Sequence, residues 1–484
     1  MGLLYLAKML EQEGDEVKII DYTAEQYKEK KLIKILEEID VVGLTVLSFS
    51  VKQTEKLIKK IKEINPHITV IIGGPHCTLF PSKSLEETHA DISVQGYGEL
   101  TILEIKKALN KKTSFSQVKG IYYKENNKIK PGKSIEKINN LDIIPFPARN
   151  LVRNYDYGTV YNPRLKKGEF TSIITSRGCP FNCRFCSRGS ISMQKYSPRS
   201  TENIIEELKE IKKSGFKSVA FVDDCFLANK NQAMEIFNQI IKEKIDLKFY
   251  IAAARVDSAD EKLYSKMKQA GVIFIQFGLE SGNQDVWDFY NKNTTVEKIK
   301  YAVKLSNKNG FFTAGSFIIG APFENERHFR KTINFAKTLP LVSVSFVPLK
   351  YMAGSELWYK AIEQGKISQD EYIITADSDR DLSKFPKEKL IKWSIKAHRE
   401  FYIRPRFFIN FLVVSIKQNN FSFMLSYILY YFISLFGKRI NYNKLWFINH
   451  HYVYLFFKII LIYAKSLFSF RWILYIIHYF FQKC

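Results

Sequence analysis

Short apolar runs alternate with helical patterns along most of this 484-residue chain, and this alternation restricts the possible folds strongly. In the first part of the chain, strands are predicted at 41–46, 69–72 and 92–94, with helices at 51–64 and 99–109. Strands that alternate with helices form parallel sheets covered by helices. We therefore predict an α/β fold that begins with a doubly wound, Rossmann-like parallel sheet.

The first element predicted in this N-terminal domain is a helix. Residues 3–12 read as a helix and 17–21 as a strand, so the strand that normally starts a doubly wound domain is missing. We predict an N-terminal domain over residues 1–112 that lacks its first strand. A linker follows over 113–169, with a hairpin at 120–130.

Six further strand and helix units follow the linker. The strands are predicted at 170–176, 218–223, 249–255, 272–279, 313–319 and 342–348. Six such units fit a partial (β/α)6 barrel over 170–370, whose reactive groups gather at the carboxyl ends of the strands. Residues 371–484 are predicted to form an α-helical C-terminal region.

Three cysteines stand directly after the first predicted barrel strand. Cys179, Cys183 and Cys186 follow a C-x3-C-x2-C spacing. Three thiolates this close together can hold one face of a 4Fe-4S cluster and leave one iron open to a small molecule. The alternative is structural zinc, which needs four converging ligands, and only one C-x2-C pair is present. We expect Cys225, the nearest other cysteine, to be a small core residue rather than a fourth ligand.

The cysteine spacing, with the aromatic Phe185 before the third cysteine, resembles the radical S-adenosylmethionine (SAM) superfamily. Gly-Gly-Pro-His at 73–76, Gly-Tyr-Gly-Glu at 96–99 and the Pro-rich bridge before the cysteines resemble the subgroup with an N-terminal cobalamin-binding domain. The resemblance implies a cluster on the three cysteines whose open iron binds SAM. It also implies that an electron from a donor such as flavodoxin or ferredoxin cleaves SAM to a 5'-deoxyadenosyl radical.

Several residues at the ends of later barrel strands resemble the SAM-binding motifs of this family. Asp223 and Asp224 end the second strand, where a carboxylate can hold the SAM ammonium group. Arg255 ends the third strand, where its guanidinium can pair with a carboxylate. The remaining candidates are Glu280, Ser281 and Gly320. Other interpretations stay open, because either aspartate can cap the following helix and Arg255 can form an ion pair at the rim.

The carboxyl edge of the N-terminal sheet is the expected cobalamin site. In the cobalamin-binding fold, which this domain resembles, that edge contacts the nucleotide tail of the corrin. The candidates are Thr45, Leu47, Gly73 and Gly74, and the two glycines allow a ligand to approach the backbone closely. No Asp-x-His-x-x-Gly motif occurs, so no histidine is nominated as a cobalt ligand, and His76 is expected in a loop.

Charge is distributed unevenly along the chain. The formal net charge is +24, and the segment from Phe401 to Cys484 contains ten Lys or Arg and no Asp or Glu. Aromatic, basic helices suit the plane of lipid headgroups. We therefore expect peripheral membrane contact and an apolar substrate. A helical cap on the barrel and RNA binding are the alternatives, and we expect no nucleic acid partner.

The cysteine content indicates a reducing compartment. Six cysteines are too few and too clustered for a secreted scaffold, and Met1–Leu10 lacks the pattern of a signal peptide. We expect a cytoplasmic protein that contacts the inner face of the membrane.

The resemblance implies a cobalamin-dependent methyltransferase acting on an unactivated carbon of a lipid, tetrapyrrole or natural product. The alternative is a radical SAM oxidoreductase or cyclase without methyl transfer. A tRNA-modifying enzyme is less favoured, because the usual further cysteine trio and C-terminal β-barrel are not recognisable in the sequence. An inactive truncated relic is the last alternative.

Overall fold

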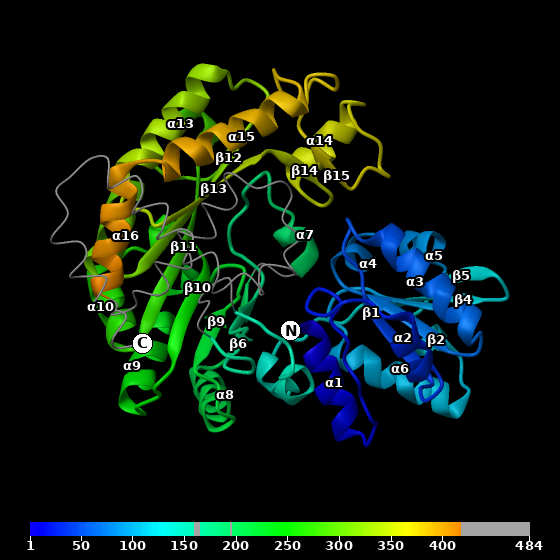
Figure 1. Cartoon of the computed structure of the whole chain (residues 1–484). Helices are drawn as coiled ribbons and strands as arrows, with labels where there is room; N and C mark the ends of the chain where they lie inside the picture. Colours follow the sequence, from blue (N-terminus) through cyan, green and yellow to red (C-terminus); the bar gives the residue numbers. More distant parts are fainter. Residues whose placement is uncertain (159–164, 194–195, 418–484) are drawn as a thin grey trace. The chain divides into compact units, whose positions relative to one another are not determined.

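Two separate sheets organise the computed structural model (Figure 1). The structure describes residues 1–158, 165–193 and 196–417, which all belong to one unit, Met1–Asn420. The first sheet has the strand order β1-β2-β3-β4-β5. Its strands are β1 (Val41–Thr45), β2 (Thr69–Gly73), β3 (Ile92–Val94), β4 (Ile121–Glu125) and β5 (Lys128–Pro131). Strands β1 to β3 are parallel, as predicted, and the hairpin that we placed in the linker pairs with β3 in antiparallel fashion.

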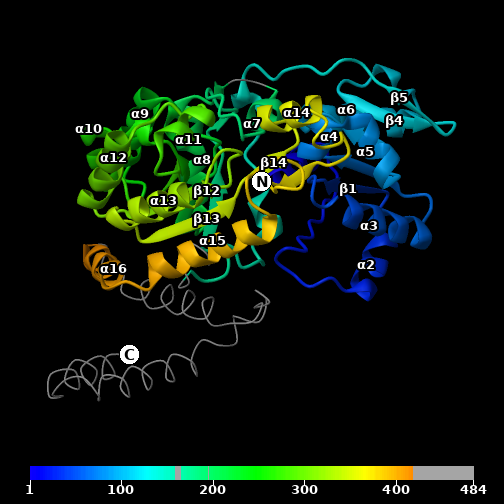
Figure 2. The ribbon, with the colours of Figure 1, turned by 90° about the horizontal axis from the view of Figure 1, so that it is seen from above.

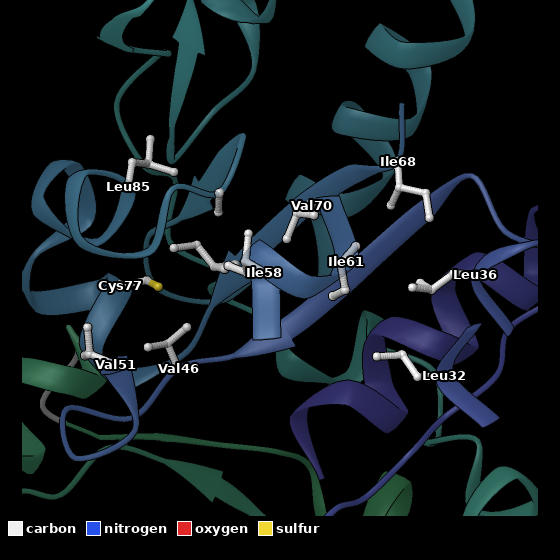
Figure 3. Close-up of a cluster of buried hydrophobic side chains, with 12 residues drawn as sticks. Leu32, Leu36, Val46, Val51, Ile58, Ile61, Ile68, Val70, Cys77 and Leu85 are labelled. Atoms are coloured by element: carbon white, nitrogen blue, oxygen red, sulfur yellow. The ribbon is translucent and has the colours of Figure 1, made fainter. Parts of the chain in front are cut away.

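Helices pack on this sheet through residues with helical spacing. They are α2 (Glu29–Leu36), α3 (Val51–Ile64), α4 (Pro75–Leu79), α5 (Pro81–Thr88) and α6 (Glu99–Lys111), whereas α1 (Gly2–Gln12) packs against α6. Ile58 and Ile61 of α3 pack with Val70 and Ile72 of β2 in one core cluster (Figure 3), whereas Ile71 belongs to a second cluster. Successive residues of β2 thus fill two different cores, because side chains alternate across a strand.

The prediction of a strand at 17–21 is wrong. These residues form no strand, and their backbone polar groups meet the Tyr155 hydroxyl instead of a neighbouring strand. That hydroxyl accepts the Asp21 N–H at 3.3 Å and donates to the Ile19 carbonyl at 3.5 Å. The described sheet therefore begins at β1.

The second sheet is parallel throughout and has the order β13-β12-β11-β10-β9-β6. Its strands are β6 (Phe170–Ile173), β9 (Ser218–Phe221), β10 (Lys248–Ala254), β11 (Val272–Glu280), β12 (Phe312–Ile319) and β13 (Ser343–Pro348). The helices between them are α8 (Thr201–Lys213), α9 (Lys230–Lys242), α10 (Glu261–Gln269), α11 (Gln284–Phe289), α12 (Val296–Lys308) and α13 (Glu326–Thr338). These helices lie along the outside of the curved sheet (Figure 2). The partial barrel of six strand and helix units is confirmed.

An antiparallel pair of short strands and three helices follow the barrel. They are β14 (Lys350–Met352), α14 (Glu356–Glu363), β15 (Ile373–Thr375), α15 (Lys387–Tyr402) and α16 (Pro405–Lys417). Helix α15 lies along β13, where the Tyr402 hydroxyl accepts the Val344 N–H at 2.8 Å. None of the described helices combines the length and apolar character needed to cross a membrane. The predictions for the basic aromatic tail beyond residue 417 lie outside the described residues.

Candidate active site

The three clustered cysteines lie on the loop between β7 (Ser176–Arg177) and α7 (Arg188–Ser192), which follows the carboxyl end of β6. All three are half-buried, and the Cys186 N–H donates to the Cys183 carbonyl at 3.0 Å, which turns the chain between these two thiols. A hydrogen bond with Cys225 lowers the pKa of Cys179, whereas burial raises the pKa of Cys183 and Cys186. A positively charged neighbour favours the thiolate form of these two cysteines.

Positive side chains lie close to this loop. The Arg255 Nη1 lies 3.5 Å from the Cys183 Sγ, and the guanidinium carbon lies 4.0 Å from the centroid of the Phe181 ring. The Lys292 Nζ lies 6.0 Å from the centroid of the Phe185 ring. Cations stabilise thiolates and the negative charge that a thiolate-bound cluster carries. The donor set thus fits a 4Fe-4S cluster held by the three cysteines.

A single metal ion would make a different demand on the site. No three His, Cys, Asp or Glu side chains of the described residues form a group that could hold one ion. In a cluster each thiolate binds a different iron, whereas zinc requires its ligands to converge on one point. Cys225 is buried beside Cys179, as expected of a core residue, and its contact with that thiol was not foreseen from the sequence.

Asp223 is tied to the residues that precede the cysteine loop. Its Oδ1 accepts hydrogen bonds from the backbone N–H and the hydroxyl of both Thr175 and Ser176. Burial raises the pKa of Asp223 to about 6, and its Oδ2 is buried with no partner among the described residues. The capping alternative is wrong for both aspartates, because Asn229 caps α9. Asp224 instead pairs with Arg188 at 3.2 Å.

Arg255 does form the ion pair that we considered as its alternative role, with Asp257 at 2.8 Å. The guanidinium is nevertheless buried, since the residue is 8% exposed, and it also donates to the Lys292 carbonyl. Its contact with Cys183 places it against the cysteine loop rather than at an outer rim. Whether it meets a SAM carboxylate stays a prediction.

Glu280 ends β11 and is paired with a lysine that the sequence did not single out. Its Oε1 lies 2.7 Å from the Lys292 Nζ, and both side chains are buried. Burial would lower the pKa of Lys292, but Glu280 and Cys183 outweigh that effect and the pKa is raised. Glu280 has a φ of 63°, a left-handed conformation that is strained for a residue with a side chain. This conformation coincides with a shift of register between β11 and β12.

The other candidates have partners or neighbours within the barrel. The Phe185 ring packs edge-on against Tyr290, with centroids 5.1 Å apart. The Ser281 hydroxyl lies 3.1 Å from that of Thr332 and is fully buried. Gly320 has a φ of 104°, and a Cβ there would lie 2.8 Å from Leu390 of α15. Packing alone therefore explains this glycine, and the roles of these residues toward SAM stay predictions.

The carboxyl edge of the first sheet brings the cobalamin candidates together. Thr45 and Gly73 end two paired strands, and the Val46 N–H donates to the Gly73 carbonyl at 2.7 Å. A Cβ on Gly73 would meet only Val94, at 3.7 Å, so the backbone is open to an incoming group. Phe49, shortly after Leu47, is 70% exposed. An open backbone next to exposed apolar surface fits a large planar ligand such as a corrin.

His76 does not lie in a loop, and this expectation is wrong. It stands at the second position of α4, because Pro75 favours the start of a helix. The imidazole is fully buried between the Ser48 hydroxyl, at 3.2 Å from Nδ1, and the Glu87 carboxylate, at 3.1 Å from Nε2. Both ring nitrogens thus have partners inside the protein.

Comparison with known proteins identifies the two domains that carry these candidate residues. Residues 173–336 match the radical SAM superfamily, and residues 1–106 match the B12 binding domain. An uncharacterized methyltransferase of Pyrococcus horikoshii is 35% identical over 415 residues, which span 84% of this chain and 89% of the relative. An anaerobic magnesium-protoporphyrin IX monomethyl ester cyclase of Rubrivivax gelatinosus is 28% identical over 326 residues, 66% of this chain and 57% of the cyclase.

A solved structure shares the fold. The cobalamin-dependent SAM radical enzyme OxsB, with aqua-cobalamin and SAM bound, aligns with a TM-score of 0.64 at 18% identity, over 90% of this chain and 69% of OxsB. The radical SAM domain implies a 4Fe-4S cluster and SAM as cofactors, and the B12 binding domain implies cobalamin. The chain therefore belongs to the radical SAM superfamily and is an enzyme of the group that carries an N-terminal B12-binding domain.

Proposed function

We propose that this enzyme is a cobalamin-dependent methyltransferase that acts on an unactivated carbon of an apolar substrate. The observation that carries the proposal is the presence, in one chain, of a three-thiol loop flanked by cations and an open B12-type sheet edge. When bound, the cofactors supply hydrogen abstraction and methyl transfer, which no protein side chain supplies at an unactivated carbon. The named relative from Pyrococcus horikoshii supports methyl transfer over other outcomes.

The residues of the chain bind and orient these groups. The proposed cluster ligands are Cys179, Cys183 and Cys186. The proposed SAM contacts are Phe185, Asp223, Asp224, Arg255, Glu280, Ser281 and Gly320. The proposed cobalamin contacts are Thr45, Leu47, Gly73 and Gly74. The unpartnered Oδ2 of Asp223 supports its role, because a buried carboxylate oxygen favours a cationic donor such as the SAM ammonium.

Isotope transfer tests the reaction. The enzyme is reconstituted anaerobically with cluster and cobalamin, reduced by flavodoxin or ferredoxin, and given methyl-deuterated SAM and a lipid extract from cells lacking this enzyme. Label in a lipid product supports methyl transfer. Release of 5'-deoxyadenosine with an unlabelled, oxidised product would instead support the oxidoreductase or cyclase reaction, which the Rubrivivax relative favours.

Two controls limit the alternatives. The Cys183→Ala variant is expected to release no 5'-deoxyadenosine, because the cluster loses one of its three ligands. An RNA fraction in place of the lipid extract is expected to remain unlabelled. A wild-type enzyme that binds its cluster but never cleaves SAM would contradict the proposal and indicate a relic.

We further propose that the enzyme meets its substrate at an anionic membrane surface. Helix α16 exposes an apolar stripe on one face, while Phe407 and Phe411 face the protein interior. The stripe consists of Ile409, Leu412, Val413 and Ile416. The exposed Arg406 and Lys417 flank it without any acidic residue in α16, which suits anionic headgroups.

Vesicle binding tests this contact. The holoenzyme is expected to sediment with vesicles that contain phosphatidylglycerol and much less with neutral phosphatidylcholine vesicles. The double variant Ile409→Ser/Ile416→Ser should weaken sedimentation about tenfold, because two exposed apolar side chains no longer enter the bilayer. Equal binding of the wild type and the double variant would contradict the proposed contact through α16.

A further inference from the structure

Arg177 stands two residues before the first cluster cysteine and is held by the N-terminal domain. Its Nη1 donates to the Glu99 Oε2 at 3.3 Å, and its Nη2 donates to the other oxygen of the same carboxylate. The two side chains are only 10% and 6% exposed. A guanidinium that binds both oxygens of one carboxylate fixes orientation as well as distance.

Two aromatic rings also contact this guanidinium. Its central carbon lies 4.2 Å from the centroid of the Tyr97 ring and 5.8 Å from that of Tyr5. Tyr5 belongs to α1, while Tyr97 and Glu99 belong to the Gly-Tyr-Gly-Glu segment at which α6 begins. All three partners thus come from the B12-binding domain.

The chain between Arg177 and Cys179 has little freedom to move independently. The Gly178 N–H donates to the Asp224 carboxylate, and Arg177 itself lies in β7, paired with β8 (Ser197–Pro198). Only one residue separates the held guanidinium from the first cysteine. A change in the position of Arg177 is therefore transmitted directly to Cys179.

We propose that Glu99 is a positioning residue for the iron–sulfur cluster, which it places relative to the bound cobalamin by holding Arg177. The B12-binding domain then supplies a contact that sets the geometry of the cluster loop, in addition to its cofactor site. This inference rests on the cluster and cobalamin of the family and is independent of which substrate is methylated.

A distance between the two cofactors tests the proposal without substrate. The reduced cluster and cob(II)alamin each carry an unpaired electron, so pulsed dipolar EPR on the frozen holoenzyme measures the distribution of distances between them. The wild type is expected to give one narrow distribution. In Glu99→Gln the amide cannot balance the guanidinium, and we expect a distribution at least twice as broad, with SAM cleavage slowed at least tenfold.

Asp91→Asn is the matched control. Asp91 stands before β3, whereas Glu99 follows the other end of that strand. The Asp91 carboxylate accepts hydrogen bonds from the Lys62 Nζ and the Val70 N–H, both at 2.7 Å. The control thus removes a partly exposed ion pair of the same domain without touching the cysteine loop. It should keep the wild-type distribution and the wild-type rate of SAM cleavage.

The outcomes separate this proposal from the proposed reaction. If Glu99→Gln retains the wild-type distance distribution, Glu99 does not position the cluster, whatever the reaction is. If methyl transfer fails in the wild type, the distance measurement still stands. Should Glu99→Gln not fold, Arg177→Lys keeps a positive charge opposite Glu99 but loses the guanidinium that donates to both carboxylate oxygens, and a wild-type distribution in that variant would overturn the proposal.

Discussion

Glu280 and Lys292 form a buried ion pair in which each charge stabilises the other. Both side chains are buried and 2.7 Å apart. We expect Lys292→Met to lower the free energy of unfolding by about 3–5 kcal/mol, because it leaves the Glu280 carboxylate buried without a partner. Urea unfolding of the apoprotein measures the change. The double variant Lys292→Met/Glu280→Gln should regain much of the loss, and a single variant as stable as the double one would contradict this reasoning.

Glu324 makes a pH-dependent contribution to stability. Its Oε2 accepts the N–H groups of Gly320 and Ala321, and burial raises its pKa from 4.5 to about 7. A raised carboxyl pKa favours the folded state at low pH, and this contribution disappears as the pH rises from about 4.5 to about 7. We expect Glu324→Gln to gain about 3 kcal/mol relative to the wild type between pH 4.5 and 7.5. If the free energies of unfolding of the two proteins differ by the same amount at every pH in this range, Glu324 does not change its protonation state in the folded protein there.

At the scale of elements, the turn from β2 into α4 depends on Gly74. Its φ is 104°, and a Cβ there would lie 3.1 Å from both the Thr45 Cγ2 and the Val46 carbonyl oxygen. We expect Gly74→Ala to destabilise the protein by about 1–3 kcal/mol and to reduce the cobalamin retained after gel filtration. Gly43→Ala is the control, because a Cβ on Gly43 in β1 meets nothing within 4 Å. Equal cobalamin content in the two variants would show that this turn does not shape the cobalamin site.

Elements with a strong internal pattern were predictable from the sequence. Helix α3 was predicted at 51–64 and is found at Val51–Ile64, because its apolar positions repeat with the helical period. The segment 17–21 has a strand-like pattern and forms no strand, since strand formation requires a neighbour and Tyr155 occupies its backbone instead. His76 was misplaced because the Gly-Gly-Pro signal reads as a turn, whereas the proline starts α4.

At the scale of the whole molecule, contacts between distant parts of the chain escaped prediction. The cysteine loop was found from spacing alone, and its neighbour Arg255 from its place after a strand. Lys292 was missed because it lies after α11 with no local pattern, and only the fold brings it to Glu280. The pairing of Arg177 with Glu99 was equally invisible, because it joins residues of two different domains. Local periodicity determines elements, but tertiary packing determines which charges meet.

A second contact of this kind joins the segment before β15 to the N-terminal domain. The Tyr372 hydroxyl donates to the Glu87 Oε1 at 2.6 Å, and the other oxygen of Glu87 meets His76. The Tyr372 ring also packs edge-on against His76, with centroids 4.6 Å apart. Because His76 in turn contacts Ser48 beside the carboxyl edge of the first sheet, Tyr372 supports that edge through Glu87 and His76.

Tyr372→Phe isolates the hydroxyl from the ring packing. A hydrogen bond to a charged group contributes about 1.5–3 kcal/mol, so its loss should raise local opening of α5 at least tenfold. Hydrogen–deuterium exchange of the α5 amides measures this opening. Tyr359→Phe is the matched control, since Tyr359 lies on α14 of the same segment and is 47% exposed. Faster exchange in α5 only for Tyr372→Phe would show that this hydrogen bond stabilises the B12-binding domain, whereas identical exchange in both variants would show that it does not.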